Sequence, residues 1–183
     1  INGKSYVDLG SDQDMGWSLA ILDDDGIIIA GKTGSGGNND IIGIAKLTAD
    51  GFPDESFGES GVVTTDISSG WDIAYSVKVQ ENNKILVTGG TESESGRDVV
   101  LVRYNGNGQP DIDFGQDGIV ITDYGSTSDT GNDIALQDDG KILIAGYKYI
   151  SGNINNIALS RYIGYEYSGP VWHISTNGSD ETG

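Results

Sequence analysis

Carboxylates gathered in one loop are the residues of this chain whose type and spacing best suit binding chemistry. Asp111, Asp113 and Asp117 lie in the loop 111–118, and carboxylate oxygens are ligands that Ca²⁺ prefers. A similar loop at 54–61 has serine in place of the second and third of these aspartates. Asp also suits tight turns. The sequence therefore leaves these three aspartates as candidates for a calcium site, with turn formation as the alternative role.

Catalytic chemistry has less support in the sequence. His173 is the only histidine and lies in the C-terminal tail, so a Ser-His-Asp triad would have to use that one imidazole. A polysaccharide hydrolase or lyase would need paired carboxylates. The acidic cluster 92–94 has only Arg97 close by in the sequence and no aromatic neighbour, which is typical of a solvated loop. We predict that the protein is not an enzyme and keep the hydrolase or lyase as the alternative.

Aromatic side chains are the candidates for ligand binding. Trp17 and Tyr75 occupy the same place, just before the first strand, in two similar segments of the chain, and Trp71 shortly precedes Tyr75. Exposed rings can stack on sugars or anchor a protein partner, although large rings more often cap a small core. The sequence leaves both roles open and names Trp17, Trp71 and Tyr75 as candidate residues of a protein- or glycan-binding face.

Composition excludes several kinds of partner. The chain carries 28 acidic and 10 basic side chains, a net charge of −18. Such a surface repels phosphate backbones and anionic membranes, so we expect no nucleic-acid binding. No apolar stretch approaches the roughly 20 residues that a membrane-spanning helix needs, so we expect no membrane insertion. Strong negative charge favours multivalent cations, which leaves Ca²⁺ as a cofactor to be tested.

The elements that position these residues recur along the chain. Residues 57–63 return in similar form at 114–120, and residues 138–146 have counterparts at 81–89 and 23–31. A fixed period of this size indicates stacked copies of one supersecondary unit, none of which can bury its apolar face alone.

Each copy is read as four antiparallel strands. In the middle copy, residues 76–80 alternate apolar and polar side chains, as a half-buried strand does. Residues 85–88 and 99–102 are apolar nearly throughout, which indicates strands covered on both faces, and residues 119–122 close the unit. We predict an all-β fold of β-propeller type, with about three four-stranded antiparallel blades.

The expected domain organisation is one repeat region, residues 1–165, followed by a tail at 166–183. Within the repeat region the copies span approximately 10–66, 67–123 and 124–165. The third copy lacks a clear fourth strand, and Ser5–Leu9 is read as the fourth strand of a preceding copy that could fill this gap.

Three blades are fewer than the four to eight of most propellers. We therefore expect a fragment of a larger propeller, and consider open stacking or a homo-oligomer that completes a ring as alternatives.

Two more positions of the repeat hold similar residues in several copies: the first predicts packing between blades, and the second predicts ion pairs. Phe57 and Phe114 occupy the same place in their copies and are expected to pack between blades. Lys46, Arg103 and Arg161 recur at the end of the third strand, where we expect them to pair with acidic turns in a structural role.

These residues carry a resemblance to a known family. Most of the chain, about residues 5 to 163, resembles the delta-60 repeat family. The residues that match the family's pattern are 139–142 and 145–146 in the third copy, and 98–105, 107–108, 111, 114–115 and 117–118 in the second. The first copy departs from the pattern, because Ile27 follows Gly26 and Lys46-Leu47 replaces Arg-Tyr. The tail 171–180 resembles the opening of right-handed parallel β-helix domains of surface proteins.

The resemblance implies β-propellers in large secreted or surface-attached bacterial proteins and no defined catalytic activity. We accordingly expect a non-catalytic module, extracellular or at the cell surface, that acts as a structural spacer or as a protein- or glycan-binding face.

Overall fold

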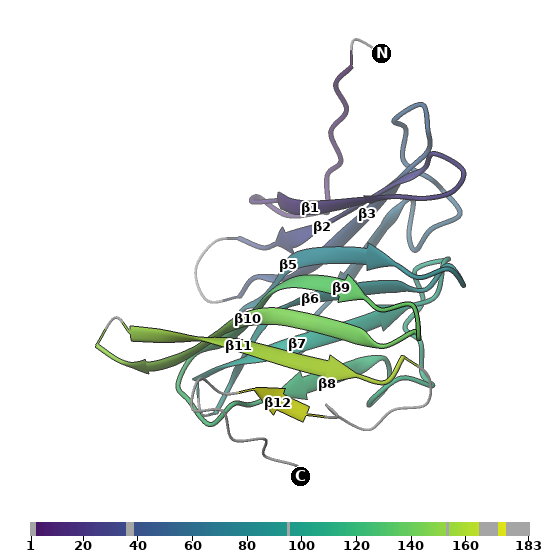
Figure 1. Cartoon of the computed structure of the whole chain (residues 1–183). Coiled ribbons are helices and arrows are strands. Elements are labelled where there is room, and N and C mark those ends of the chain that lie inside the picture. Colours follow the sequence, from purple (N-terminus) through teal and green to yellow (C-terminus); the bar gives the residue numbers. More distant parts are fainter. Residues whose placement is uncertain (1–2, 36–38, 95, 153, 165–171, 175–183) are drawn as a thin grey trace.

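A computed structural model describes residues 3–35, 39–94, 96–152, 154–164 and 172–174, the last three without their side chains. The described residues form strands, turns and loops and contain no helix, so they include no helical segment able to cross a membrane. The strands make three antiparallel sheets of four strands each (Figure 1). The predicted all-β fold with three four-stranded units is confirmed.

Strand order follows the chain in every sheet. The first sheet contains β1 (Met15–Ile21), β2 (Ile27–Thr33), β3 (Ile41–Leu47) and β4 (Val62–Thr65). The second contains β5 (Asp72–Val79), β6 (Ile85–Ser93), β7 (Gly96–Tyr104) and β8 (Ile119–Thr122). The third contains β9 (Asp129–Leu136), β10 (Ile142–Ser151), β11 (Ile154–Tyr162) and β12 (Trp172–Ile174).

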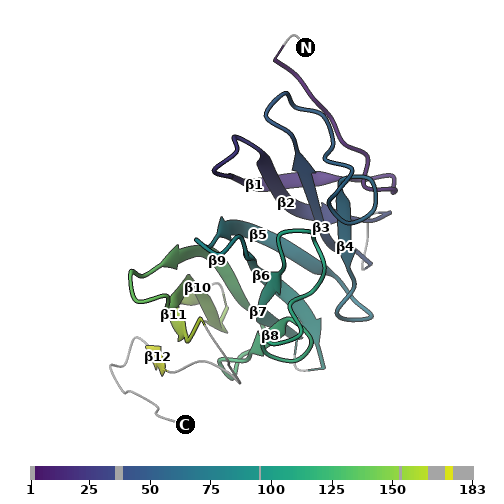
Figure 2. The ribbon, with the colours of Figure 1, turned by 90° about the vertical axis from the view of Figure 1, so that its right-hand side faces the viewer.

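The three sheets fan out from their first strands. Figure 2 shows β1, β5 and β9 next to one another, with the later strands of each sheet spreading away from them in different directions. β5 contacts both β1 and β9. This is the arrangement of neighbouring propeller blades, whose first strands lie nearest the axis.

Hydrogen bonds join the first strands of neighbouring sheets. The hydroxyl of Ser18 on β1 accepts the backbone N–H of Val77 on β5 at 3.2 Å. The hydroxyl of Ser76, the equivalent residue of β5, accepts the N–H of Ile134 on β9 at 3.3 Å and donates to Asp133 at 2.8 Å. The edge of a sheet presents unpaired N–H groups, and at each of these two junctions a serine of the preceding sheet satisfies one of them.

The turns between the first and second strands explain why acidic and amide residues gather there. Asp25, Asn83 and Gly140 hold the same place in their turns and have φ angles of 60°, 61° and 79°. Asp, Asn and Gly tolerate this left-handed conformation better than other residues do. Turn geometry therefore accounts for these positions without a bound cation.

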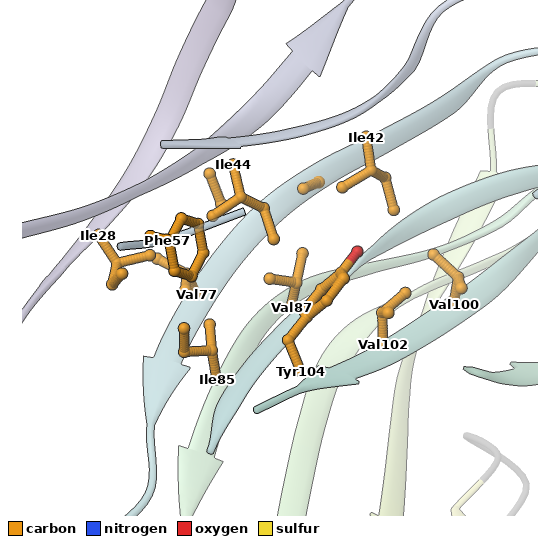
Figure 3. Close-up of a cluster of buried hydrophobic side chains, with 12 residues drawn as sticks. Ile28, Ile42, Ile44, Phe57, Val77, Ile85, Val87, Val100, Val102 and Tyr104 are labelled. Atoms are coloured by element: carbon orange, nitrogen blue, oxygen red, sulfur yellow. The ribbon is translucent and has the colours of Figure 1, made fainter. Parts of the chain in front are cut away.

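Both faces of the second sheet are covered. Val99, Val100, Leu101 and Val102 are each at most 1 % exposed. Val100 and Val102 share an apolar cluster with Ile28 and Ile44 of the first sheet (Figure 3). Their neighbours Val99 and Leu101 point the other way and share a second cluster with Ile134 and Ile144 of the third sheet. The predicted two-sided burial of this strand is confirmed.

The two recurring phenylalanines complete these clusters. Phe57 is fully buried in the cluster between the first and second sheets, and Phe114 is fully buried in the cluster between the second and third. Beside Phe57, the backbone N–H of Gly58 donates to the carbonyl of Asn107 in the neighbouring copy at 2.9 Å. The prediction that Phe57 and Phe114 pack between blades is confirmed.

The outer faces of the first and third sheets remain open at the positions that are buried in the second. Leu19 on β1 is 61 % exposed, whereas Val77, its equivalent on β5, is fully buried. Ile157 on β11 is 78 % exposed, whereas Val99, its equivalent on β7, is 1 % exposed. Each outer face therefore exposes apolar side chains at positions that, in the second sheet, pack against a neighbouring sheet.

Two sequence-based assignments at the ends of the chain were wrong. Ser5–Leu9 is not a strand: the Ser5 hydroxyl donates to the carbonyl of Gly51 at 2.6 Å, and Leu9 packs over Gly43, on the face of the first sheet that points away from the second sheet. The fourth strand of the third sheet is not missing, because β12 pairs antiparallel with β11. Residues 165–171 and 175–183 lie outside the described residues, so the β-helix resemblance of the tail stays a prediction.

The buried position of Phe114 leads to a stability prediction. Phe114→Ala should lower the free energy of unfolding by about 3–5 kcal/mol, because it leaves a cavity between two sheets. Urea denaturation measures this change. Phe52→Ala, which truncates an exposed ring, is the control and should change stability by less than about 0.5 kcal/mol. A Phe114→Ala protein as stable as the Phe52→Ala protein would contradict the inter-sheet packing.

Candidate functional site

Trp17 and Tyr75 are placed by β-bulges. In β1 the pairing with β2 skips Trp17 between Gly16 and Ser18, and in β5 the pairing with β6 skips Tyr75 in the same way. In β9 the skipped residue is Asn132. A bulge frees one residue from the ladder and re-aims its side chain. Trp17 and Tyr75 share a sequence position because each is the bulged residue of the first strand of its sheet.

A glycine opposite each bulge makes this device possible. Gly31, Gly89 and Gly146 are the glycines that close the recurring second-strand motif, and each lies across the ladder from a bulge. A Cβ on Gly89 would overlap the carbonyl oxygen of Ile73, and the other two glycines meet the equivalent carbonyl of their own first strands. Only glycine lets the bulged backbone come this close. The recurrence of this residue in the sequence has a steric cause.

The structure brings Trp17 and Tyr75 together from two different sheets. Their ring centroids lie 5.4 Å apart, with the ring planes tilted by 44°. Trp17 remains 43 % exposed, and Tyr75 is half-buried, with burial raising the pKa of its phenol above the ordinary value. The two rings cap the junction between β1 and β5 and still present an aromatic surface to solvent.

Trp71 joins this surface through Arg97. The guanidinium carbon of Arg97 lies 3.4 Å from the centroid of the Trp71 ring, a cation–π arrangement. The positive charge of Arg97 also acts on the Tyr75 phenol, where it partly offsets the effect of burial on the pKa. We call Trp17, Trp71, Tyr75 and Arg97 the aromatic face. All three aromatic candidates of the sequence belong to it, and Arg97 is a member that sequence reasoning did not include.

The acidic cluster 92–94 lies close to an aromatic residue. The prediction that it is a solvated loop without an aromatic neighbour was therefore wrong. Asp72 pairs with Thr91, so the start of β5 lies beside the end of β6. A carboxylate oxygen of Glu92 accepts the backbone N–H of Trp71 at 3.3 Å. Glu92 therefore lies at the edge of the aromatic face, a proximity created by strand pairing and invisible in the linear sequence.

A recurring aspartate organises the entry to each first strand. One carboxylate oxygen each of Asp14, Asp72 and Asp129 accepts the backbone N–H of the residue five positions earlier, at 2.8, 2.7 and 2.8 Å. A serine hydroxyl in the intervening loop donates to the other oxygen in every copy. Sequence reasoning missed these aspartates, although their spacing matches the period of the repeat and could have revealed them.

Two of the recurring cations, Lys46 and Arg103, pair with acidic turns as predicted, and the pairing of Arg161 stays a prediction. Lys46 lies 2.8 Å from Asp54, and the Lys46 hydrogen bond lowers the pKa of Asp54 to about 2. In the next copy, Arg103 lies 2.6 Å from Asp111. In the third copy, hydrogen bonds from Lys141 are the main cause of the lowered pKa of Asp139, and the charge of Arg161 adds to their effect.

These ion pairs bear on the calcium candidates of the sequence. Asp111 is held by Arg103 and also by Lys84, whose amine lies 3.0 Å away. Burial raises the pKa of Asp111, but the Lys84 hydrogen bond and the Arg103 charge outweigh it and lower the pKa. Asp113 and Asp117 are exposed, and the structure does not gather the three carboxylates. Within the described ranges, the three carboxylates that do converge are those of Asp98, Asp123 and Asp129.

The only histidine lies in β12. The backbone of His173 pairs opposite Ser160 of β11, and its side chain lies outside the described part of the chain.

Comparison with known proteins identifies the repeat. The family described as "Domain of unknown function (DUF5122) beta-propeller" matches residues 24–57, 80–114 and 137–162, just over half of the chain. Each matched segment begins at the turn after a first strand and includes the second and third strands of one sheet. The first two segments end at Phe57 and Phe114. No curated protein matches the chain.

The glycine opposite the second bulge provides a test of how the aromatic face is built. Gly89→Ala should lower the free energy of unfolding by at least about 1–3 kcal/mol, because the new methyl group would overlap the Ile73 carbonyl. The adjacent Gly90→Ala is a matched control: its Cβ would meet only flexible side-chain atoms, the nearest being Arg97 Cδ at 3.2 Å. Thermal and urea denaturation compare the two. Equal stability of both variants would show that the bulge does not require glycine.

Proposed function

The chain belongs to the DUF5122 β-propeller family, and on this premise we propose that it is a non-catalytic binding module of a large secreted or cell-surface protein, which uses the aromatic face to bind glycans. The observation that carries the proposal is the grouping of Trp17, Tyr75, Trp71 and Arg97, which lie on or next to β1, β5 and β7 of two neighbouring sheets. The resemblance to delta-60 repeats supports the extracellular setting.

The composition of the aromatic face suits a sugar. Ring faces stack on the C–H surfaces of pyranose rings through the same apolar and quadrupolar interactions that pair aromatic side chains. The Arg97 guanidinium and the Glu92 carboxylate, at the edge of the face, supply a charged donor and an acceptor for hydroxyl groups. Trp17 is exposed enough to contact a ligand without rearrangement of the backbone.

The proposal also accounts for asymmetry among the repeats. The third copy has Asn132 at its bulge in place of an aromatic residue, so the aromatic face belongs to the first and second copies. A purely structural spacer has no need for this difference, whereas a binding site is built at one place in a repeat array. The homo-oligomer considered from the sequence stays a prediction, supported by the open apolar positions at Leu19 and Ile157.

Glycan binding is tested with a glycan array probed with the full chain, followed by titration of the glycans that bind. Trp17→Ala and Trp71→Ala should each weaken binding at least about tenfold, as expected for truncation of a central aromatic contact. Phe52→Ala, which removes an exposed ring outside the aromatic face, should bind like the wild type. All variants should keep the wild-type melting temperature within a few degrees.

Wild-type affinity in the Trp17→Ala and Trp71→Ala proteins would contradict the placement of the site. An array without any signal would leave a spacer or protein-binding role. Turnover of a bound glycan would instead support the polysaccharide hydrolase or lyase considered from the sequence.

A further inference from the structure

Three carboxylates converge where the second sheet meets the third. Asp98 lies on β7, Asp123 directly follows β8, and Asp129 begins β9. Val99 pairs with Thr122, which places Asp98 beside Asp123 within the second sheet. Asp129 approaches from the third sheet, and one oxygen from each carboxylate lies within 4.8 Å of the other two. We call Asp98, Asp123 and Asp129 the acidic junction.

Burial makes this grouping unfavourable unless a cation is present. Asp98 is 4 % exposed and Asp129 is fully buried. Oxygen Oδ1 of Asp98 is buried and has no hydrogen-bond partner. A buried carboxylate is normally paired with a cation or saturated with hydrogen bonds, because removing its charge from water is otherwise costly. Asp98 thus has one buried oxygen without a hydrogen-bond partner, and its carboxylate lies beside two other anions.

Basic side chains near the acidic junction are engaged elsewhere. Arg97, the neighbour of Asp98, stacks on Trp71. The Lys148 ammonium donates to the backbone carbonyl of Tyr124. Within the described residues, none of the three carboxylates forms an ion pair with a lysine or arginine.

The junction between the first and second sheets shows that the fold does not require a carboxylate at position 98. Asp98 pairs with Thr91, and the residue that pairs with the equivalent Thr33 is Ile41. Asp66 and Asp72 occupy the places of Asp123 and Asp129 in that junction. An isoleucine therefore suffices at this position in one copy, whereas the next copy has a third carboxylate there.

We propose that Asp98, Asp123 and Asp129 bind one Ca²⁺ ion that joins the second sheet to the third. An all-oxygen set of carboxylates suits this hard cation, and water molecules would complete its six to eight ligands. Asp129 is already oriented, because its carboxylate accepts the Tyr124 N–H at 2.8 Å and the Ser126 hydroxyl. This site is separate from the aromatic face and does not rest on the proposed glycan binding.

The test is a calcium titration of the full chain after removal of metals with a chelator. Isothermal titration calorimetry should show one site per chain, and the melting temperature should rise by about 5–10 °C at a calcium concentration 100-fold above Kd. Asp98→Asn and Asp123→Asn should each weaken binding at least about tenfold, because each removes a direct ligand charge. In chelator, Asp98→Asn should be at least as stable as the wild type, because it removes an uncompensated buried charge.

A matched control separates a built site from the general attraction of an acidic protein for cations. Asp66→Asn removes the same charge from the equivalent position of the first junction and should leave calcium affinity unchanged. Asp123 is exposed, so its variant should fold even if a change at Asp98 does not. Absence of a calcium-dependent shift in the wild type, or equal losses in Asp66→Asn and Asp123→Asn, would overturn the proposal.

Discussion

Burial of both faces of one β-sheet is the constraint on which the rest of this structure depends. Val100 and Leu101 are neighbours in β7, yet one packs against the first sheet and the other against the third. A sheet with two apolar faces cannot be stable alone in water. The second sheet therefore requires neighbours on both sides, and Phe57 and Phe114 fill the two resulting interfaces. This requirement explains why the same unit is repeated along the chain.

The same packing places the candidate sites at the junctions between sheets. Stacked sheets bring their first strands side by side, and the bulges at Trp17 and Tyr75 direct two rings into one contact. The acidic junction also combines strands of two sheets, because Asp129 comes from β9 whereas Asp98 comes from β7. Both features use residues that the periodic scaffold does not need, namely an aromatic ring at a bulge and, at Asp98, a third carboxylate that is buried.

Sequence reasoning found the elements of the fold because burial leaves a direct trace in the residue pattern. Continuous apolar runs such as Val99–Val102 indicated strands with two covered faces, and the recurrence of phenylalanine indicated inter-sheet packing. Ser5–Leu9 was wrongly predicted to be a strand because its apolar residues suggested pairing at a sheet edge. Leu9 instead packs on the face of the first sheet, over Gly43, where no side chain occupies the space.

The sites were harder to predict, since their contacts cross between sheets. The sequence named Trp17, Tyr75 and Trp71, but the ring contact and the partnership with Arg97 depend on which strands become neighbours. The acidic junction was hidden for a related reason: Asp123 and Asp129 have counterparts in the preceding copy, but Asp98 has isoleucine at the equivalent position, so the third carboxylate left no periodic signal.

Two-sided burial of the second sheet can be measured directly, because the chain contains no cysteine. Single thiols are introduced at adjacent positions of β7 by Val100→Cys and Leu101→Cys, and at the outer face of the third sheet by Ile157→Cys. With a thiol reagent under native conditions, the Ile157→Cys protein should react at once. The other two should react only at the rate of global unfolding, and to the same extent. Rapid labelling at either Val100→Cys or Leu101→Cys would show one face open to solvent and would contradict the packing of three sheets.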